Sequence, residues 1–160
     1  MSLAAALAGG LVGTVVLTTA LRAASEARLT RMDIPFLLGT ALTEDRRRAK
    51  ALGYATHFLF GLLFALVYWL VFSAVGRAGW LFGAGLGAVH ALFAGGALVS
   101  VLLPAVHPRM GDDSTTARES PTIEPPGFML RNYGARTPLV ALAAHVAYGA
   151  IVGGLVGLAD

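Results

Sequence analysis

Four long uncharged stretches constrain this chain more than any other feature. Residues 2–21, 51–76, 78–106 and 137–159 contain no Asp, Glu, Lys or Arg. A helix needs about 20 mostly apolar residues to cross a bilayer, and each stretch is that long. We therefore predict an all-α four-helix transmembrane bundle, with spans at about 3–22, 51–76, 79–104 and 137–159. Residues 1–160 would then form a single membrane domain in contact with the lipid bilayer.

The composition excludes several kinds of chemistry. The chain is 56% hydrophobic and only 13% charged, whereas soluble domains carry about 25% charged residues. It has no cysteine, which rules out disulfides, iron–sulfur clusters, thiolate zinc sites and covalently attached haem. A bound metal would have to be held by His, Asp, Glu, Met or backbone oxygens.

The positive charges predict how the chain is oriented. Eleven of the twelve Lys and Arg residues lie in the connections 22–50 and 107–136, and such residues favour the cytoplasmic side. We therefore expect the loops 23–50 and 105–136 to be cytoplasmic and both termini to lie on the non-cytoplasmic side. The run Arg46, Arg47, Arg48 and Lys50 would be a topology anchor and an anionic-lipid contact. Because the bases flank apolar runs, we expect no nucleic-acid partner.

Short motifs in the loops predict local structure. In "MDIPFLLGT", Asp33 is placed as an N-cap with Pro35 in the first turn, which predicts a short helix lying against the bundle. In "TEDRRRAK", Thr43 is the expected cap of the second long helix. The apolar segment "PGFMLRNYG" is expected to fold back on the membrane surface.

The two halves of the chain resemble each other. "THFLFGLLFAL" and "AHVAYGAIVGG" both contain His-x-x-x-Gly, at His57 and Gly61 and at His145 and Gly149. "GGLVGTVV" and "GAGLGAVH" open the first and third spans. This pattern predicts two related antiparallel hairpins, related by an axis along the membrane normal.

Three histidines fall on predicted inward faces. His57, His90 and His145 each share a helix face with glycine or alanine, as close-packed faces do. An ionisable group inside a membrane must find a partner and is a candidate functional residue. His107 would join them only if Pro104 redirects the chain. The packing glycines Gly61, Gly83, Gly87, Gly149 and Gly153 could serve the bundle or a partner subunit.

Several roles for the histidines stay open at this level. Two imidazoles at equal depth are what bis-His ligation of haem b requires, with Tyr68 and Tyr148 as hydrogen-bonding neighbours. Three histidines with Met110 or Asp112 could bind a transition metal ion, and Asp33 could add a carboxylate. The imidazoles could also relay protons, or join helices through hydrogen bonds.

The chain resembles a family of small four-helix bacterial membrane proteins. The elements that carry the resemblance span nearly the whole chain: Met32-Asp33-Ile34-Pro35, the pair His107-Pro108, and the histidines of the second, third and fourth spans. The resemblance implies the four-span fold and no particular activity. Alanine richness and the preference for Arg over Lys suggest a GC-rich bacterial genome. We expect a multi-pass protein of the bacterial cytoplasmic (inner) membrane.

The function expected from the sequence is that of a non-enzymatic binding module. Its histidine cluster would bind haem b or a transition metal, and the protein would act as an accessory subunit of a larger redox or transport complex. The partners would be other membrane subunits or further copies of the chain. The alternatives are a small homo-oligomeric carrier or channel lined by histidines, and a purely structural interaction protein.

Overall fold

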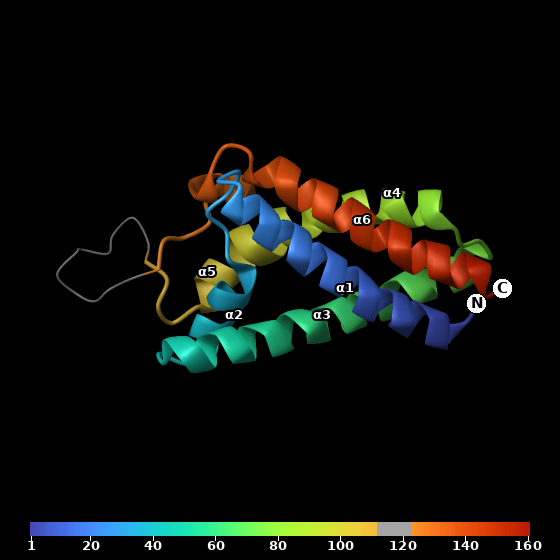
Figure 1. Ribbon diagram of the computed structural model, residues 1–160, viewed down its shortest axis with the longest axis horizontal. Helices are drawn as coiled ribbons and strands as arrows, with labels where there is room; N and C mark the ends of the chain where they lie inside the picture. Colours follow the sequence, from blue (N-terminus) through green and yellow to red (C-terminus); the bar gives the residue numbers. More distant parts are fainter. Residues whose placement is uncertain (112–122) are drawn as a thin grey trace.

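A computed structural model describes residues 1–111 and 123–160, and the elements in these residues are helical (Figure 1). A lone bridge between Met110 and Ile123 is the one β-type pairing in that part of the chain. In chain order the helices are α1 (Leu3–Glu26), α2 (Ile34–Leu42), α3 (Arg46–Val75), α4 (Trp80–Leu92), the π-helix η1 (Phe93–Leu102), α5 (Leu103–Val106), the 3₁₀ helix η2 (Phe128–Tyr133) and α6 (Thr137–Leu158).

Four of these helical stretches are long and apolar enough to cross a membrane. They are α1, α3, the continuous stretch Trp80–Val106 and α6. The predicted all-α fold with four membrane-capable helices is therefore confirmed.

Both chain ends lie at one end of the bundle, as four passes require (Figure 1). The backbone N–H of Ser2 donates to Asp160 Oδ1 at 3.0 Å, and the Met1 amine lies 3.5 Å from the same oxygen. The Trp69 indole N–H donates to the Met1 carbonyl at 3.0 Å, which ties the far end of α3 to the N-terminus. Which side of a membrane this end faces stays a prediction.

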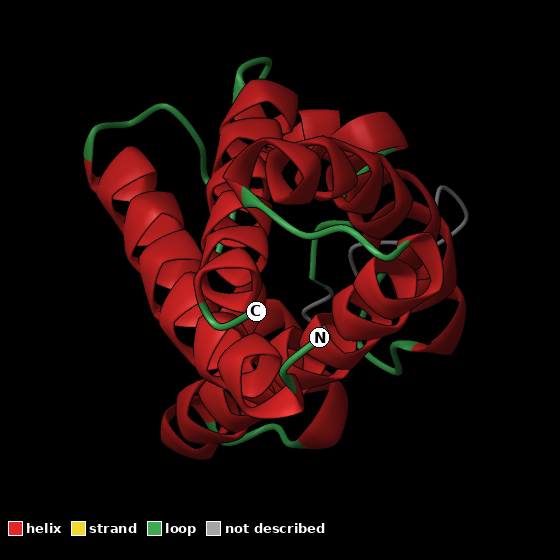
Figure 2. Ribbon diagram, turned by 90° about the vertical axis from the view of Figure 1, so that its right-hand side faces the viewer, coloured by secondary structure: helices red, strands yellow, loops and turns green. Residues whose placement is uncertain are grey.

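The helices pack as two antiparallel pairs. Helix α1 packs on α3, α4 packs on α6, and α1 and α6 join the two pairs. These pairs are the two predicted hairpins. In contrast, the backbones of α3 and α4 scarcely approach each other although a short turn connects them. Aromatic side chains bridge this gap, with the Phe72 and Phe82 ring centroids 5.6 Å apart. Figure 2 shows the bundle from the end where both termini lie. The space between these backbones is open farther along, between α3 and η1, where a cavity lies.

The short helix α2 lies flat against the start of α3. A Cβ at Gly39 would collide with the carbonyl of Ala49, and a Cβ at Gly53 with that of Pro35. Asp33 caps α2 as predicted, because its Oδ1 accepts the Phe36 N–H at 3.1 Å.

The predicted cap of the second long helix is wrong by two residues. Asp45, not Thr43, caps α3, and its carboxylate accepts the Arg48 N–H at 2.8 Å. A carboxylate is also favoured at a helix N-terminus by the helix dipole. Thr43 instead ends α2, and its N–H donates to the Gly39 carbonyl at 3.1 Å.

The third long helix changes its winding halfway along. Ten residues, Phe93–Leu102, adopt the wider π-helical form between α4 and α5. The Ser100 hydroxyl donates to the carbonyl of Gly95 at 2.5 Å, five residues earlier. Pro104, which has no N–H, follows directly after this segment. The sequence predicted a change of direction only at Pro104, so the irregularity begins about three turns earlier than expected.

Candidate functional site

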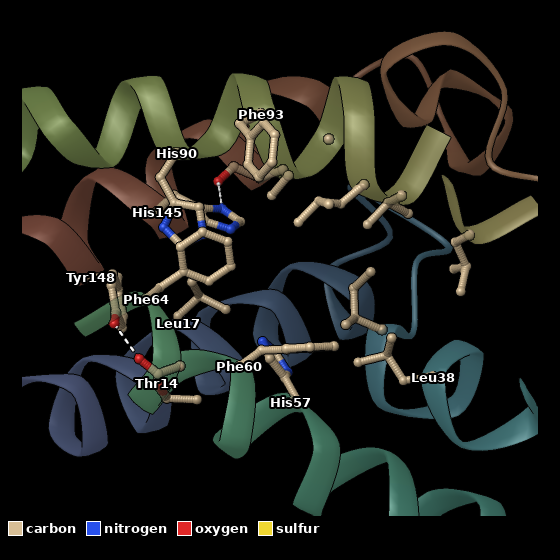
Figure 3. Close-up of a pocket in the computed structure, with 18 of the residues that line it drawn as sticks. Thr14, Leu17, Leu38, His57, Phe60, Phe64, His90, Phe93, His145 and Tyr148 are labelled. Carbon is tan, nitrogen blue, oxygen red and sulfur yellow. Dashed lines mark hydrogen bonds between the residues drawn. The ribbon is translucent and has the colours of Figure 1, made fainter. Parts of the chain in front are cut away.

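A cavity of about 500 Å³ fills the opening between α3 and η1. Its walls come from all four long helices, with α2 and η2 closing the end near the loops (Figure 3). His57, His90 and His145 all line it. The cavity therefore brings together three of the four histidines considered from the sequence.

A hydrogen bond within its own helix determines which ring nitrogen of His145 carries the proton. Its Nδ1 lies 2.8 Å from the carbonyl oxygen of Ala141. A carbonyl can only accept, so Nδ1 carries the proton and Nε2 of the neutral ring has a free lone pair. This backbone bond is the arrangement that orients histidines which bind metals.

His90 lies directly against His145. The two ring centroids are 4.8 Å apart and the rings meet edge to face. On its other side His90 contacts Phe64, with ring centroids 3.8 Å apart. Its Nδ1 is 3.4 Å from the hydroxyl of Tyr68, the predicted supporting residue.

His57 lies across the cavity from the other two imidazoles (Figure 3). Its Nδ1 is buried and has no hydrogen-bond partner among the described residues. Two hydroxyls of the cavity wall donate to backbone carbonyls, Thr14 to Gly10 at 2.6 Å and Tyr148 to Gly61 at 2.5 Å. A buried polar atom without a partner is costly, so a ligand that satisfied it would bind more tightly.

The rest of the wall is apolar. Aliphatic and aromatic side chains make up most of it, and none of the described lining residues is Asp, Glu, Lys or Arg. Phe93, Leu98 and Leu102 come from η1, and Leu130 from η2. No pattern in the sequence marked these four residues as part of a site. The Gly95-Gly96 pair, close to Ser100, was the one signal that this helix departs from regular winding.

His107 lies apart from the other three histidines. It joins α5 to α2 near the loop end, where its Nε2 lies 3.2 Å from the Leu37 carbonyl and 3.2 Å from the Thr40 hydroxyl. The Arg109 N–H donates to its Nδ1 at 3.1 Å. Burial, the largest effect, lowers the pKa of this imidazole. Both ring nitrogens are engaged within the chain, which is the pattern of a structural histidine.

The remaining predicted site residues are dispersed. Asp33 caps α2 and lies 3.6 Å from the Lys50 ammonium. Met110 is half-buried beside Ile123, and Asp112 lies outside the described residues. Within residues 1–111 and 123–160 there is no group of three His, Asp or Glu side chains arranged to hold a metal ion.

The basic run and the packing glycines occupy different surfaces. Arg46, Arg47, Arg48 and Lys50 are exposed at the start of α3, with the Arg46 guanidinium 5.6 Å from the centre of the Phe36 ring. Gly83 and Gly87 face Gly149 and Gly153 across the α4–α6 contact, and Gly61 faces Thr14 of α1. These glycine faces are therefore occupied by helices of the same chain.

These features define a small all-helical protein with four membrane-capable helices around a histidine-lined apolar cavity. Comparison of the chain with protein-family models, with curated proteins and with solved structures finds no match. The resemblance to a four-span bacterial family stays a prediction.

Proposed function

We propose that this protein is a non-enzymatic membrane module that binds haem b in the cavity between α3 and η1. The observation that carries the proposal is the state of His145. Its Nδ1–H is bonded to a backbone carbonyl, so its Nε2 lone pair is available as an axial ligand.

Haem demands less of the protein than a bare metal ion does. The macrocycle supplies four nitrogens itself, so one or two imidazoles complete the coordination of the iron. His145 is the first candidate ligand, and His57, which also lines the cavity, is the second. A cavity of about 500 Å³ also lies within the range of about 300–1,000 Å³ that is typical of sites for cofactors and small molecules.

The test is an ultraviolet–visible spectrum of the purified protein in mild detergent, with elemental analysis for iron, copper, zinc and manganese. We expect a Soret band and stoichiometric iron. His145→Leu should abolish the band and His57→Leu should weaken or shift it. His107→Gln, which changes a histidine outside the cavity, should leave the band intact. A stable, colourless protein without metal would refute the proposal.

A second candidate ligand is an uncharged lipid-soluble molecule with a carbonyl or hydroxyl group, such as a quinone. It is favoured by the lining, which offers no described cation to the propionates of haem. Such a ligand would hydrogen-bond to the imidazoles and enter from the bilayer between α3 and η1. Organic extraction of the purified protein, followed by mass spectrometry, distinguishes this ligand from haem.

We further propose that the module is a subunit of a larger membrane redox or transport complex in a bacterial cytoplasmic membrane. Two features support this proposal. Most of the described residues lie in helices, and the basic residues are concentrated in two loops. Pull-down from detergent-solubilised membranes of the source organism tests the first part. Cysteine labelling at the exposed positions Arg47 and Arg77 from each side tests the orientation.

A further inference from the structure

A second hollow lies at the loop end of the bundle. It measures about 310 Å³ and lies between the last turns of α1, the start of α2 and the first turns of α3. Unlike the histidine cavity it is lined largely by polar and charged side chains, among them Arg22, Glu26, Asp33 and Lys50. Because the histidine cavity uses none of these four residues, this hollow is a separate candidate site.

Both cations of the hollow have unused donors. The Arg22 Nε donates to Glu26 at 2.7 Å, while its two terminal nitrogens bond to nothing in the described part of the chain. The Lys50 ammonium lies 3.6 Å from Asp33 Oδ2, too far for a hydrogen bond. A guanidinium with two free NH₂ groups and an ammonium both line this hollow, and both groups are common ligands of phosphate.

Both anions of the hollow have unused acceptors. Asp33 uses Oδ1 to cap α2, so Oδ2 remains, and Glu26 uses Oε1 on Arg22. Carboxylate oxygens accept hydrogen bonds from a primary ammonium. The half-exposed ring of Tyr54, which also lines the hollow, can add a cation–π contact.

The position of the hollow fits a membrane surface. It lies where α1 ends and the loop begins, and Leu21, Met32 and Ile34 form its apolar floor. The same three residues form part of the wall of the histidine cavity. A molecule in the hollow would therefore rest its polar end on charged side chains and its apolar part on the bundle.

We propose that this hollow binds the headgroup of a phosphoethanolamine lipid. Arg22 and Lys50 bind the phosphate, and Glu26 and Asp33 bind the ammonium. The four side chains sum to zero charge, which matches a zwitterion. An anionic phosphoglycerol headgroup would meet two carboxylates without compensation. A choline headgroup has no N–H to donate to them. The inference does not depend on what the histidine cavity binds.

The test is native mass spectrometry of the full chain in mild detergent. Phosphatidylethanolamine, phosphatidylcholine and phosphatidylglycerol with identical acyl chains are added in turn. We expect one phosphatidylethanolamine to bind at least about tenfold more tightly than either of the others, equivalent to about one charge-assisted hydrogen bond. Competition with soluble phosphoethanolamine distinguishes headgroup recognition from acyl-chain binding, and should displace the lipid at high concentration.

Matched variants separate this site from general lipid attraction. Arg22→Gln and Lys50→Gln should each weaken phosphatidylethanolamine binding about tenfold. Arg28→Gln, which removes an arginine near the hollow that does not line it, should have no effect. The double variant Glu26→Gln, Asp33→Asn leaves two cations, so its preference should move to phosphatidylglycerol. Asparagine keeps the cap of α2.

Two results would overturn the proposal. One is equal binding of the three lipids by the unaltered protein, which would indicate non-specific annular lipid. The other is an equal effect of Arg22→Gln and Arg28→Gln in variants that elute and unfold like the unaltered chain.

Discussion

The two ring nitrogens of His107 have different roles, and this difference makes the residue sensitive to acid. Nδ1 accepts the Arg109 N–H, so it carries no proton, while Nε2–H donates to the Leu37 carbonyl. Protonation at Nδ1 would replace this accepted bond by repulsion between two N–H groups. The Arg109 side chain also donates to the Thr40 carbonyl and pairs with Glu44 at 3.3 Å, so a cation already lies nearby.

We predict that His107 destabilises the fold at low pH. Its pKa in the folded protein is lower than its usual value of about 6.5. As the pH falls below about 6.5, the unfolded chain binds more protons at this residue than the folded protein does. The free energy of unfolding therefore decreases. Thermal unfolding at pH 7.5 and pH 5.5 should show a smaller loss of stability for His107→Gln than for the unaltered protein. Equal losses in both would contradict this assignment.

The sequence predicted which histidines meet, but not the state of each ring. Helical spacing places His57, His90 and His145 on inward faces, and the cavity contains all three. The Ala141 carbonyl bonded to His145 and the unpartnered Nδ1 of His57 depend on side-chain rotamers. Such rotamers are set by neighbouring helices, so spacing along one helix cannot reveal them.

At the scale of the element, the contact between α4 and α6 depends on backbone touching backbone. Gly83 faces the Gly149 carbonyl so closely that a Cβ at position 83 would overlap it. Gly85, two residues further along α4 and therefore on the opposite face, has no atom within 4 Å of an added Cβ. The two glycines therefore provide a test position and a matched control position in one helix.

We predict opposite effects of alanine at these two positions. Gly83→Ala should destabilise the protein by about 1–3 kcal/mol, because α4 must move away from α6. Gly85→Ala should be neutral or stabilising by up to about 1 kcal/mol, because alanine favours the helix. The measurement is unfolding in detergent followed by circular dichroism. Equal destabilisation by both variants would show that the close approach of α4 and α6 at Gly83 does not determine the stability of the protein.

The positions of the helices in the sequence could be predicted better than the distances between the packed helices. Hydropathy and capping residues predicted the four long helices and α2, because these signals are local in the sequence. The π-helical winding of η1 and the separation of α3 from α4 were not predicted. An apolar side chain looks the same in sequence whether it faces lipid, a cavity or another helix, so the cavity wall could not be read from hydropathy.

At the scale of the molecule, the two hairpins are joined covalently at helices whose backbones scarcely approach each other. The turn at 76–79 connects α3 to α4, whereas the packing between the hairpins runs through α1 and α6. We predict that chains 1–77 and 78–160, expressed together, assemble through α1 and α6. A tag on one fragment should retain the other in mild detergent. Failure to co-purify, with both fragments present in the membrane, would contradict this prediction.

The opening between α3 and η1 also bears on how such a chain could arise by duplication. If two identical hairpins paired about a two-fold axis, the contacts corresponding to α1–α6 and to α4–α3 would be equivalent. A substitution that brought the helices together in one contact would do the same in the other. Here the backbones of α1 and α6 are in close contact, whereas those of the counterpart pair, α4 and α3, scarcely approach each other. The cavity opens beside this second pair, between α3 and η1. Once the two copies lie in one chain, each can acquire its own substitutions. Covalent linkage thus permits one contact to hold the bundle together while the other can diverge to bind a ligand.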